Sequence, residues 1–148
     1  MITIDEMNAD DIAEFARIDK ECFTVPWSEK AFSDEYNNGI ATYFAARSDG
    51  ECIGYIGFWN VGSGDITNVA VCEKYRRRGV GGMLINAVIS RAAAMGLDNL
   101  TLEVRKSNTA ARRLYEKYGF KAIGVRKRYY RDNNEDAIIM SRSLKEQE

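Results

Sequence analysis

The stretch Tyr75-Arg76-Arg77-Arg78-Gly79-Val80-Gly81-Gly82 decides the fold, and a largely apolar run, 83–89, follows it at once. The residues before it, Ile66 to Val71, have the composition of a β-strand, and those after it favour a helix. A strand, a glycine-rich turn and a helix therefore follow one another. Such a turn leaves backbone N–H groups unpaired, and the helix dipole adds partial positive charge there. We predict an anion site, most naturally one for phosphate, at this glycine turn (residues 75–82).

The spacing of the glycines narrows the kind of phosphate site. A nucleoside-triphosphate P-loop would continue with Gly-Lys-Ser/Thr, which is absent. A dinucleotide fingerprint needs G-x-G-x-x-G, whereas Gly79-x-Gly81-Gly82 runs into Leu84. On spacing alone, a glycine-rich helix start with solvated arginines remains the alternative.

Periodicity extends the prediction to the whole chain. Four helices are expected. The first runs from near Ala9, capped by Asn8, to Cys22, and the second from just after the Ser28 cap to about Tyr36. The other two span 80–95 and 109–118. Strands are expected at 2–4, 43–47, 52–59, 65–71, 99–104, 121–130 and 137–143. We predict one α/β domain over residues 1–148, with a mixed, mostly antiparallel sheet, a central parallel step and about four flanking helices.

Composition excludes several kinds of chemistry. The chain has no histidine, so Ser-His-Asp and Cys-His mechanisms are excluded. The three cysteines lack close ligand spacing, so no metal site is expected. Three scattered cysteines are also typical of a chain whose thiols stay reduced. The sequence has no apolar run of about 18 residues and no secretory signal. We therefore expect a cytoplasmic protein without a membrane partner. The net charge of −1 argues against a nucleic-acid partner.

Two side chains downstream could perform acid–base chemistry. In the strand 99–105, side chains alternate between the two faces, so Glu103 lies on the face opposite Leu102 and Val104. A carboxylate that faces a partly dry cleft can act as a general base. A surface carboxylate paired with Arg105 or Lys106 is the competing interpretation. Tyr115, about two turns into the next helix, could protonate a leaving thiolate, although a half-buried packing role is equally ordinary.

The run Arg126-Lys127-Arg128-Tyr129-Tyr130-Arg131 alternates between basic and aromatic residues. Its composition allows RNA binding by stacking and charge. It equally allows an edge strand protected by charge, or one wall of an active site.

Arg76 to Gly81 resembles the Gln/Arg-x-x-Gly-x-Gly/Ala motif of the GCN5-related N-acetyltransferases (GNAT). The order of predicted elements is similar to that fold over nearly the whole chain. More narrowly, the chain resembles the bacterial ribosomal-protein-alanine N-acetyltransferases, which acetylate the N-terminal alanine of small-subunit ribosomal protein eighteen. Matching segments include Pro26 to Lys30, Leu102 to Arg105, and Glu135 to Met140.

The resemblance implies roles for individual residues. It implies that acetyl-coenzyme A (acetyl-CoA) is the acetyl donor, and that Glu103 accepts a proton and Tyr115 donates one. It implies that Tyr129 and Tyr130 belong to a substrate-side hairpin. The cofactor-binding residues it implies are Val69, Ala70 and Val71 for the pantetheine arm, Arg77, Arg78, Gly79, Val80, Gly81 and Gly82 for the pyrophosphate, and Asn108.

From these features we expect acetyl transfer from acetyl-CoA to a protein N-terminal amine, above all that N-terminal alanine, by direct attack in a ternary complex. The partner would be a protein or peptide N-terminus. A GNAT enzyme for a small amine or a lysine side chain is the first alternative. An RNA-binding module that uses Arg76–Arg78 and Arg126–Arg131 is the second.

Overall fold

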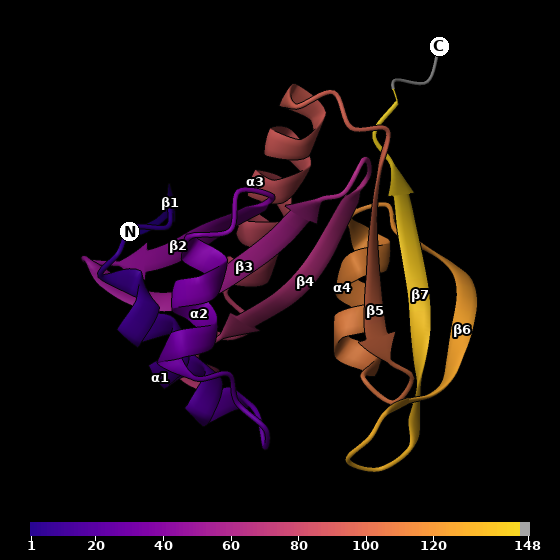
Figure 1. The fold of residues 1–148 in the computed structure, drawn as a ribbon, viewed down its shortest axis with the longest axis horizontal. Helices are drawn as coiled ribbons and strands as arrows, with labels where there is room; N and C mark the ends of the chain where they lie inside the picture. Colours follow the sequence, from indigo (N-terminus) through magenta and orange to yellow (C-terminus); the bar gives the residue numbers. More distant parts are fainter. Residues whose placement is uncertain (146–148) are drawn as a thin grey trace.

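A seven-stranded sheet spans the molecule in the computed structural model, which describes residues 1–145 (Figure 1). Its strand order is β1-β2-β3-β4-β5-β7-β6, and only β4 and β5 run parallel. The strands are β1 (Ile2–Glu6), β2 (Ala41–Ser48), β3 (Glu51–Asn60), β4 (Gly64–Val71), β5 (Asn99–Arg105), β6 (Lys121–Tyr130) and β7 (Glu135–Ser143). The predicted mixed sheet with one central parallel step is confirmed. The last three residues of the predicted domain, 146–148, lie outside the described part.

Four helices flank this sheet, as predicted. They are α1 (Asp11–Cys22), α2 (Glu29–Tyr36), α3 (Val80–Ala94) and α4 (Thr109–Lys117). In Figure 1, α1 and α2 lie in front of the β2–β4 half of the sheet, and α3 lies behind it. A short 3-10 helix, η1 (Glu73–Tyr75), which the sequence did not predict, leads from β4 into the glycine turn.

Strand β2 explains how both faces of the sheet are covered. Tyr43 and Ala45 pack with α1 and α2, whereas Phe44 and Ala46 pack with α3. All four are buried because alternate side chains of a strand point to opposite faces, and here each face has its own helix layer. The N-terminal half of the sheet is therefore the middle layer of a three-layer unit.

The start of α1 differs from the prediction. The Asn8 side chain accepts a hydrogen bond from the Asp10 N–H (2.9 Å), but α1 begins only at Asp11. Asn8 thus caps a turn that precedes the helix. The helix begins later than predicted because the Asp11 carboxylate accepts the Asn8 N–H (2.9 Å) and also binds Arg47.

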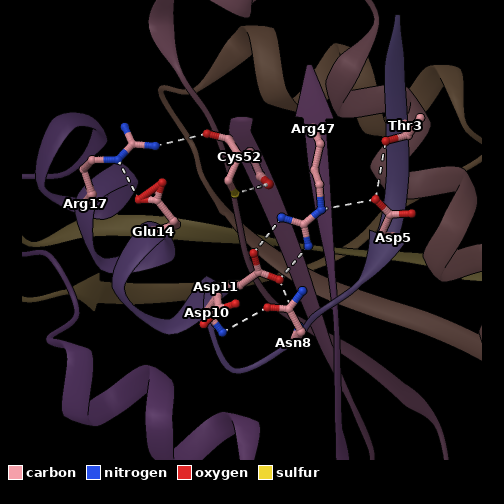
Figure 2. Close-up of polar contacts among 10 residues, drawn as sticks. Thr3, Asp5, Asn8, Asp10, Asp11, Glu14, Arg17, Arg47 and Cys52 are labelled. Atoms are coloured by element: carbon pink, nitrogen blue, oxygen red, sulfur yellow. Dashed lines mark hydrogen bonds and ion pairs between the residues drawn. The ribbon is translucent and has the colours of Figure 1, made fainter. Parts of the chain in front are cut away.

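A buried ion pair fixes α1 to β2 (Figure 2). The Asp11 side chain is about 2% exposed, and its two oxygens accept hydrogen bonds of 2.8 Å from the two terminal nitrogens of Arg47. Asp5 on β1 binds the Nε of the same guanidinium at 3.1 Å. Removal of one partner from such a pair leaves a buried charge without compensation.

We expect Asp11→Asn to lower the free energy of unfolding by about 3 kcal/mol, since an amide nitrogen cannot accept a hydrogen bond from Arg47. The residual contact of Arg47 with Asp5 keeps the loss at the lower end of the usual range. Urea denaturation measures it. The matched control is Glu14→Gln, which breaks the exposed pair with Arg17 that Figure 2 also shows and should cost less than about 1 kcal/mol. Equal losses in the two variants would contradict the prediction.

Candidate active site

The sheet separates between its two parallel strands. Strands β4 and β5 pair only at Gly64–Leu100 and Asp65–Thr101. The register between β3 and β4 then shifts, because Phe58 lies opposite Ile66 and Gly57 lies opposite Asn68, which leaves Thr67 as a bulge residue. A bulge bends its strand and increases the local twist. The bend carries the rest of β4 away from β5, as Figure 1 shows.

A cleft of about 880 Å³ opens where the strands separate. Its walls come from both halves of the molecule: the segment that joins α1 to α2, β4, β5, the start of α4, and the β6–β7 hairpin. The predicted residues that line it are Val69, Glu103, Asn108, Tyr115 and Tyr130. Residues distant in the chain thus meet in one place.

The glycine turn begins just after the carboxyl end of β4. Arg77 and Gly79 have positive φ angles of 65° and 78°, and Gly79 is the N-cap of α3. Among residues 1–145, no acceptor is bound to the backbone N–H groups of Arg77 to Gly82. Six consecutive unpaired donors at a helix start have the geometry that an anion such as a pyrophosphate would need, so the anion site stays a prediction at this turn.

The arginines of the turn have different surroundings. The Arg76 side chain points back, with its Nε donating to the Val71 carbonyl (3.0 Å) and its Nη2 to the Cys22 sulfur (3.4 Å). Arg78 lies over the Tyr75 ring, 5.4 Å from the ring centre. Arg76 therefore links the turn to the cleft wall, and the anion site depends on the backbone of the turn.

Two positions of the turn favour glycine for different reasons. A Cβ atom on Gly82 would lie 2.0 Å from the Tyr118 hydroxyl, so this glycine permits α3 to approach α4 closely. A Cβ on Gly79 would meet nothing within 4 Å, and only its φ of +78° favours glycine.

The free edge of β4 offers backbone groups to the cleft. The Cys72 N–H donates to the Ile53 carbonyl (2.8 Å), which sets the alternation of hydrogen bonds along the antiparallel β3–β4 pair. By that alternation, the backbone groups of Ala70 face β3, while those of Val69 and Val71 face the free edge. Of the three predicted β4 residues, Val69 and Val71 can hold a ligand by their backbones, and Ala70 is left with a packing role beside them.

Glu103 lies on β5 with the predicted alternation, since the neighbours Leu102 and Val104 are buried on the other face. Its side chain is about 26% exposed, and its Oε1 accepts a hydrogen bond of 3.1 Å from Arg126 Nε. The competing interpretation, a pair with Arg105 or Lys106, does not hold for Arg105, which binds Asp132 and Glu135 instead. Within residues 1–145 the second oxygen, Oε2, accepts no hydrogen bond, but the Tyr129 phenol lies near this carboxylate: burial, and next the Glu103 charge, raise the pKa of Tyr129.

Tyr115 combines burial with an available hydroxyl. The ring packs edge-on against Phe120 (5.8 Å between centres) in the core that contains Leu102 and Val104. Burial raises the pKa of Tyr115 above its ordinary value. It lines the cleft, and no hydrogen bond within residues 1–145 engages its hydroxyl. Glu103 and Tyr115 therefore lie on opposite faces of β5 and reach one cleft.

Asn108, which the resemblance assigns to coenzyme A, is the N-cap of α4. Its Oδ1 accepts the Ala111 N–H (3.1 Å) and so caps α4. It also lines the cleft, where its Nδ2 stays available as a donor.

The two tyrosines of the β6–β7 hairpin differ in position. Tyr130 lines the cleft beneath the Arg105 guanidinium, which lies 4.0 Å from the ring centre. The Tyr129 ring lies edge-on to the Tyr130 ring and is exposed. Glu135 fixes the hairpin by accepting hydrogen bonds from Ser107 and Arg105. These bonds, those from Ser107 first, lower the pKa of Glu135 to about 2. The predicted strand 121–130 is interrupted by a register shift between Arg126 and Tyr130, where Arg128 has a φ of 54°.

Comparison with known proteins agrees with this arrangement. The model of the acetyltransferase (GNAT) family matches residues 12–120, which is most of the chain. The chain belongs to the GNAT family of acetyltransferases. Its sheet, with one parallel pair and a cleft beside it, is the GNAT fold.

Curated relatives carry a narrower name. The chain is 38% identical over 136 residues to a Bacillus subtilis (strain 168) protein provisionally named as a ribosomal protein bS18-alanine N-acetyltransferase, with 90% of each chain covered. It is 32% identical over 143 residues to the Escherichia coli (strain K12) ribosomal protein bS18-alanine N-acetyltransferase, with 95% of this chain and 97% of the relative covered. The crystal structure of an Escherichia coli ribosomal-protein-S18-alanine N-acetyltransferase superposes with a TM-score of 0.91 at 31% identity, covering 100% and 97% of the chains.

GNAT acetyltransferases use acetyl-CoA. Within residues 1–145, no three His, Cys, Asp or Glu side chains gather in a way that could hold a metal ion. Over the same residues, no helix is both long and apolar enough to cross a membrane.

Sequence reasoning missed one wall of the cleft. Asp19, Tyr55 and Asn68 line it and are joined by hydrogen bonds. One signal was present, because Asp19 lies four residues after Phe15 and three before Cys22, within the apolar stripe of α1. A carboxylate in such a stripe is expected to have a specific partner.

We expect Gly79→Ala to weaken acetyl-CoA binding about tenfold, since a left-handed conformation costs an alanine about 1–2 kcal/mol and the anion site requires it. Calorimetric titration with acetyl-CoA measures the loss. Gly50→Ala is the matched control, because Gly50 has a φ of +86° and equally open space in the β2–β3 hairpin, away from the cleft. Similar acetyl-CoA affinities in the two variants would argue against the turn as the binding site.

Proposed function

We propose that this GNAT protein transfers the acetyl group of acetyl-CoA to a protein N-terminal amine, and that its acceptor is the N-terminal alanine of ribosomal protein bS18. The main support is the meeting of Glu103, Tyr115 and the free edge of β4 in one cleft beside the glycine turn. The names of the Bacillus subtilis and Escherichia coli relatives supply the identity of the acceptor. Since that acceptor is a ribosomal protein, we propose a cytoplasmic location.

The donor would be held along β4 and the turn. The unpaired N–H groups of Arg77 to Gly82 suit the pyrophosphate, the Val69 and Val71 backbones suit the pantetheine arm, and the Asn108 amide is available beside them. Bound there, acetyl-CoA supplies an activated thioester carbonyl. An N–H of Val69 or Val71 at the free edge would stabilise negative charge that develops on its oxygen.

The acceptor amine must lose a proton. An α-amino group has a pKa of about 8, so at neutral pH it arrives mostly as an ammonium ion. Glu103 is the proton acceptor in this proposal, directly or through a water, by way of Oε2. Tyr115 is the donor for the departing sulfur, and Tyr129 and Tyr130 form the part of the wall that faces the acceptor.

Direct attack of the amine in a ternary complex accounts for the arrangement without a covalent enzyme intermediate. The thiol beside the turn, Cys72, is buried, and this burial raises its pKa. A thiol with a raised pKa is a poor nucleophile near neutral pH.

Two other functions are weighed against this one. A small amine or a lysine side chain as acceptor would use the same donor site, so only substrate tests distinguish it. RNA binding by the β6 run has weaker support, because Arg126 is paired with Glu103 and the net charge of the chain is −1.

The deciding experiment incubates the protein with acetyl-CoA and an Ala-initiated peptide of the bS18 N-terminus, then locates the acetyl group by mass spectrometry. We expect it on the terminal amine. The same peptide with a blocked N-terminus and an internal lysine, and a panel of polyamines and aminoglycosides, are the comparisons. Transfer to lysine or to a small amine alone would refute the proposed acceptor.

A further inference from the structure

Two turns of the chain meet at the carboxyl end of β5. The first (residues 105–108) leads from β5 into α4, and the second (residues 130–136) contains the connection between β6 and β7. The β5–β7 ladder ends at the pair Arg105–Ala137, after which the Lys106 N–H donates to the Asp136 carbonyl (3.1 Å). Both turns contribute side chains to the cleft lining, so their connection shapes this part of the cleft.

Glu135 joins the two turns through its side chain. Its Oε2 accepts the Ser107 N–H at 2.7 Å, and its Oε1 accepts a hydrogen bond of 3.3 Å from Arg105 Nη1. Only about 15% of this side chain is exposed, although it lines the cleft. With its pKa lowered to about 2, by the bonds from Ser107 first, Glu135 stays ionised near neutral pH, so both oxygens remain acceptors.

The contact with Ser107 reaches the donor side of the cleft. Ser107 directly precedes Asn108, the N-cap of α4, and both residues line the cleft. The turn is thus fixed twice, by the cap from Asn108 to the Ala111 N–H (3.1 Å) and by Glu135 on the Ser107 N–H. In the proposed function, this turn presents the Asn108 amide to acetyl-CoA.

The contact with Arg105 reaches the acceptor side. The Arg105 guanidinium lies over the Tyr130 ring, 4.0 Å from the ring centre, and both residues line the cleft. Asp132 binds the same guanidinium, with distances of 2.9 and 3.2 Å to its two terminal nitrogens. Because a planar guanidinium stacks on an aromatic face, the carboxylates that orient Arg105 also orient Tyr130. Over residues 1–145, the Asp132 carboxylate accepts hydrogen bonds from Arg105 alone.

We propose that Glu135 is a positioning residue for both substrates, because it holds the Asn108 turn through Ser107 and the Tyr130 wall through Arg105. This inference rests on the proposed function. Direct transfer requires the amine and the thioester carbon to approach within about 3–3.5 Å, and a displacement of about 1 Å can cost 10²-fold in rate. A carboxylate that fixes the two walls to each other sets this approach through its neighbours.

The test compares Glu135→Ala with Asp132→Ala. Both variants remove a carboxylate that binds Arg105 from the same hairpin, but only the first also releases Ser107. We expect both to raise KM for an Ala-initiated peptide about tenfold, and Glu135→Ala alone to weaken acetyl-CoA binding about fivefold. Steady-state kinetics and calorimetric titration with acetyl-CoA measure the two effects. A purely structural role would lower kcat through the folded fraction and leave KM and acetyl-CoA affinity unchanged.

Glu135→Gln is a second variant in case Glu135→Ala does not fold. Its amide nitrogen cannot accept a hydrogen bond, so one of the two contacts is lost, and either the peptide KM or the acetyl-CoA affinity should change about threefold or more. No change in either quantity overturns the inference.

For Glu135→Ala, an acetyl-CoA affinity that stays at the wild-type value, or that falls equally in Asp132→Ala, overturns the inference. So does an unchanged peptide KM. Acetylation of the peptide by the wild-type protein in those cases leaves the proposed function standing. If the wild-type protein acetylates only a lysine or a small amine, the proposed acceptor is rejected, and the same comparison with that amine still tests Glu135.

Discussion

Glu103→Gln is expected to lower kcat/KM for the acceptor peptide on the order of 10³-fold at pH 6–7 and to leave acetyl-CoA affinity unchanged. Glutamine keeps the shape of the side chain and can still accept the Arg126 hydrogen bond, but it cannot take a proton. The loss should shrink as the pH rises past the amine pKa of about 8, because the acceptor then arrives already deprotonated. Steady-state kinetics from pH 6 to 10, with calorimetry for acetyl-CoA, measure both effects.

The matched control for Glu103 is its partner. Arg126→Met removes the same ion pair and leaves the carboxylate in place. If Glu103 serves as a base, Arg126→Met keeps most of the activity. If Glu103 only anchors Arg126, both variants lose the same activity at every pH, and Glu103 is then a surface carboxylate. The pH dependence separates these outcomes even if Arg126→Met perturbs the β6–β7 hairpin.

The elements of the fold were predictable because their signals are local. The glycines of the turn, the alternation around Glu103 and the helical spacing of Phe15 and Ile18 depend on neighbours a few residues away. The parallel step between β4 and β5 also followed, since a helix the length of α3 between two strands requires a crossover. Each of these predictions is confirmed by the structure.

The contacts of the site depend on register and on distant pairings, which local patterns do not contain. The partner of Glu103 is Arg126, 23 residues away, because β7 lies between β5 and β6 and brings the two side chains to one face. The Asp11–Arg47 pair spans 36 residues. The bulge at Thr67, which opens the cleft, has no glycine or proline beside it on β4, and the glycine at the register shift, Gly57, lies on the neighbouring strand β3.

Arg76 illustrates how one side chain of a motif can have contacts that the pattern does not indicate. The pattern places a positive charge beside a phosphate site, and three arginines in a row favour that interpretation. In the structure the Val71 carbonyl, left free at the edge of β4, accepts the Arg76 side chain. The predicted anion site therefore depends on backbone geometry, which is why Gly79 is a sharper test of it than Arg76.

Tyr115→Phe is expected to lower kcat about 10²-fold, with little change in either KM. Burial raises the pKa of Tyr115 above its ordinary value of about 10, so the phenol keeps its proton throughout the neutral and mildly alkaline range. Wild-type activity should consequently show no alkaline decline below pH 10 from this group. The raised pKa also makes complete transfer to a thiolate, with a thiol pKa near 8.5, energetically uphill. A charge-assisted hydrogen bond, with about 1.5–3 kcal/mol of stabilisation, accounts for most of the expected loss.

The leaving group provides the discriminating measurement for Tyr115. An acetyl thioester whose thiol has a lower pKa needs less help as its sulfur departs, so the ratio of wild-type to Tyr115→Phe rates should fall with such a donor. Tyr36→Phe is the matched control, since it removes an exposed phenol hydroxyl from α2, outside the residues that line the cleft and away from the glycine turn. A loss of rate of less than twofold in Tyr115→Phe, or a loss that does not change with the thiol pKa of the leaving group, would mean that Tyr115 only packs against Phe120. The cleft would then hold a base without a matching acid, and a solvent proton would have to reach the thiolate.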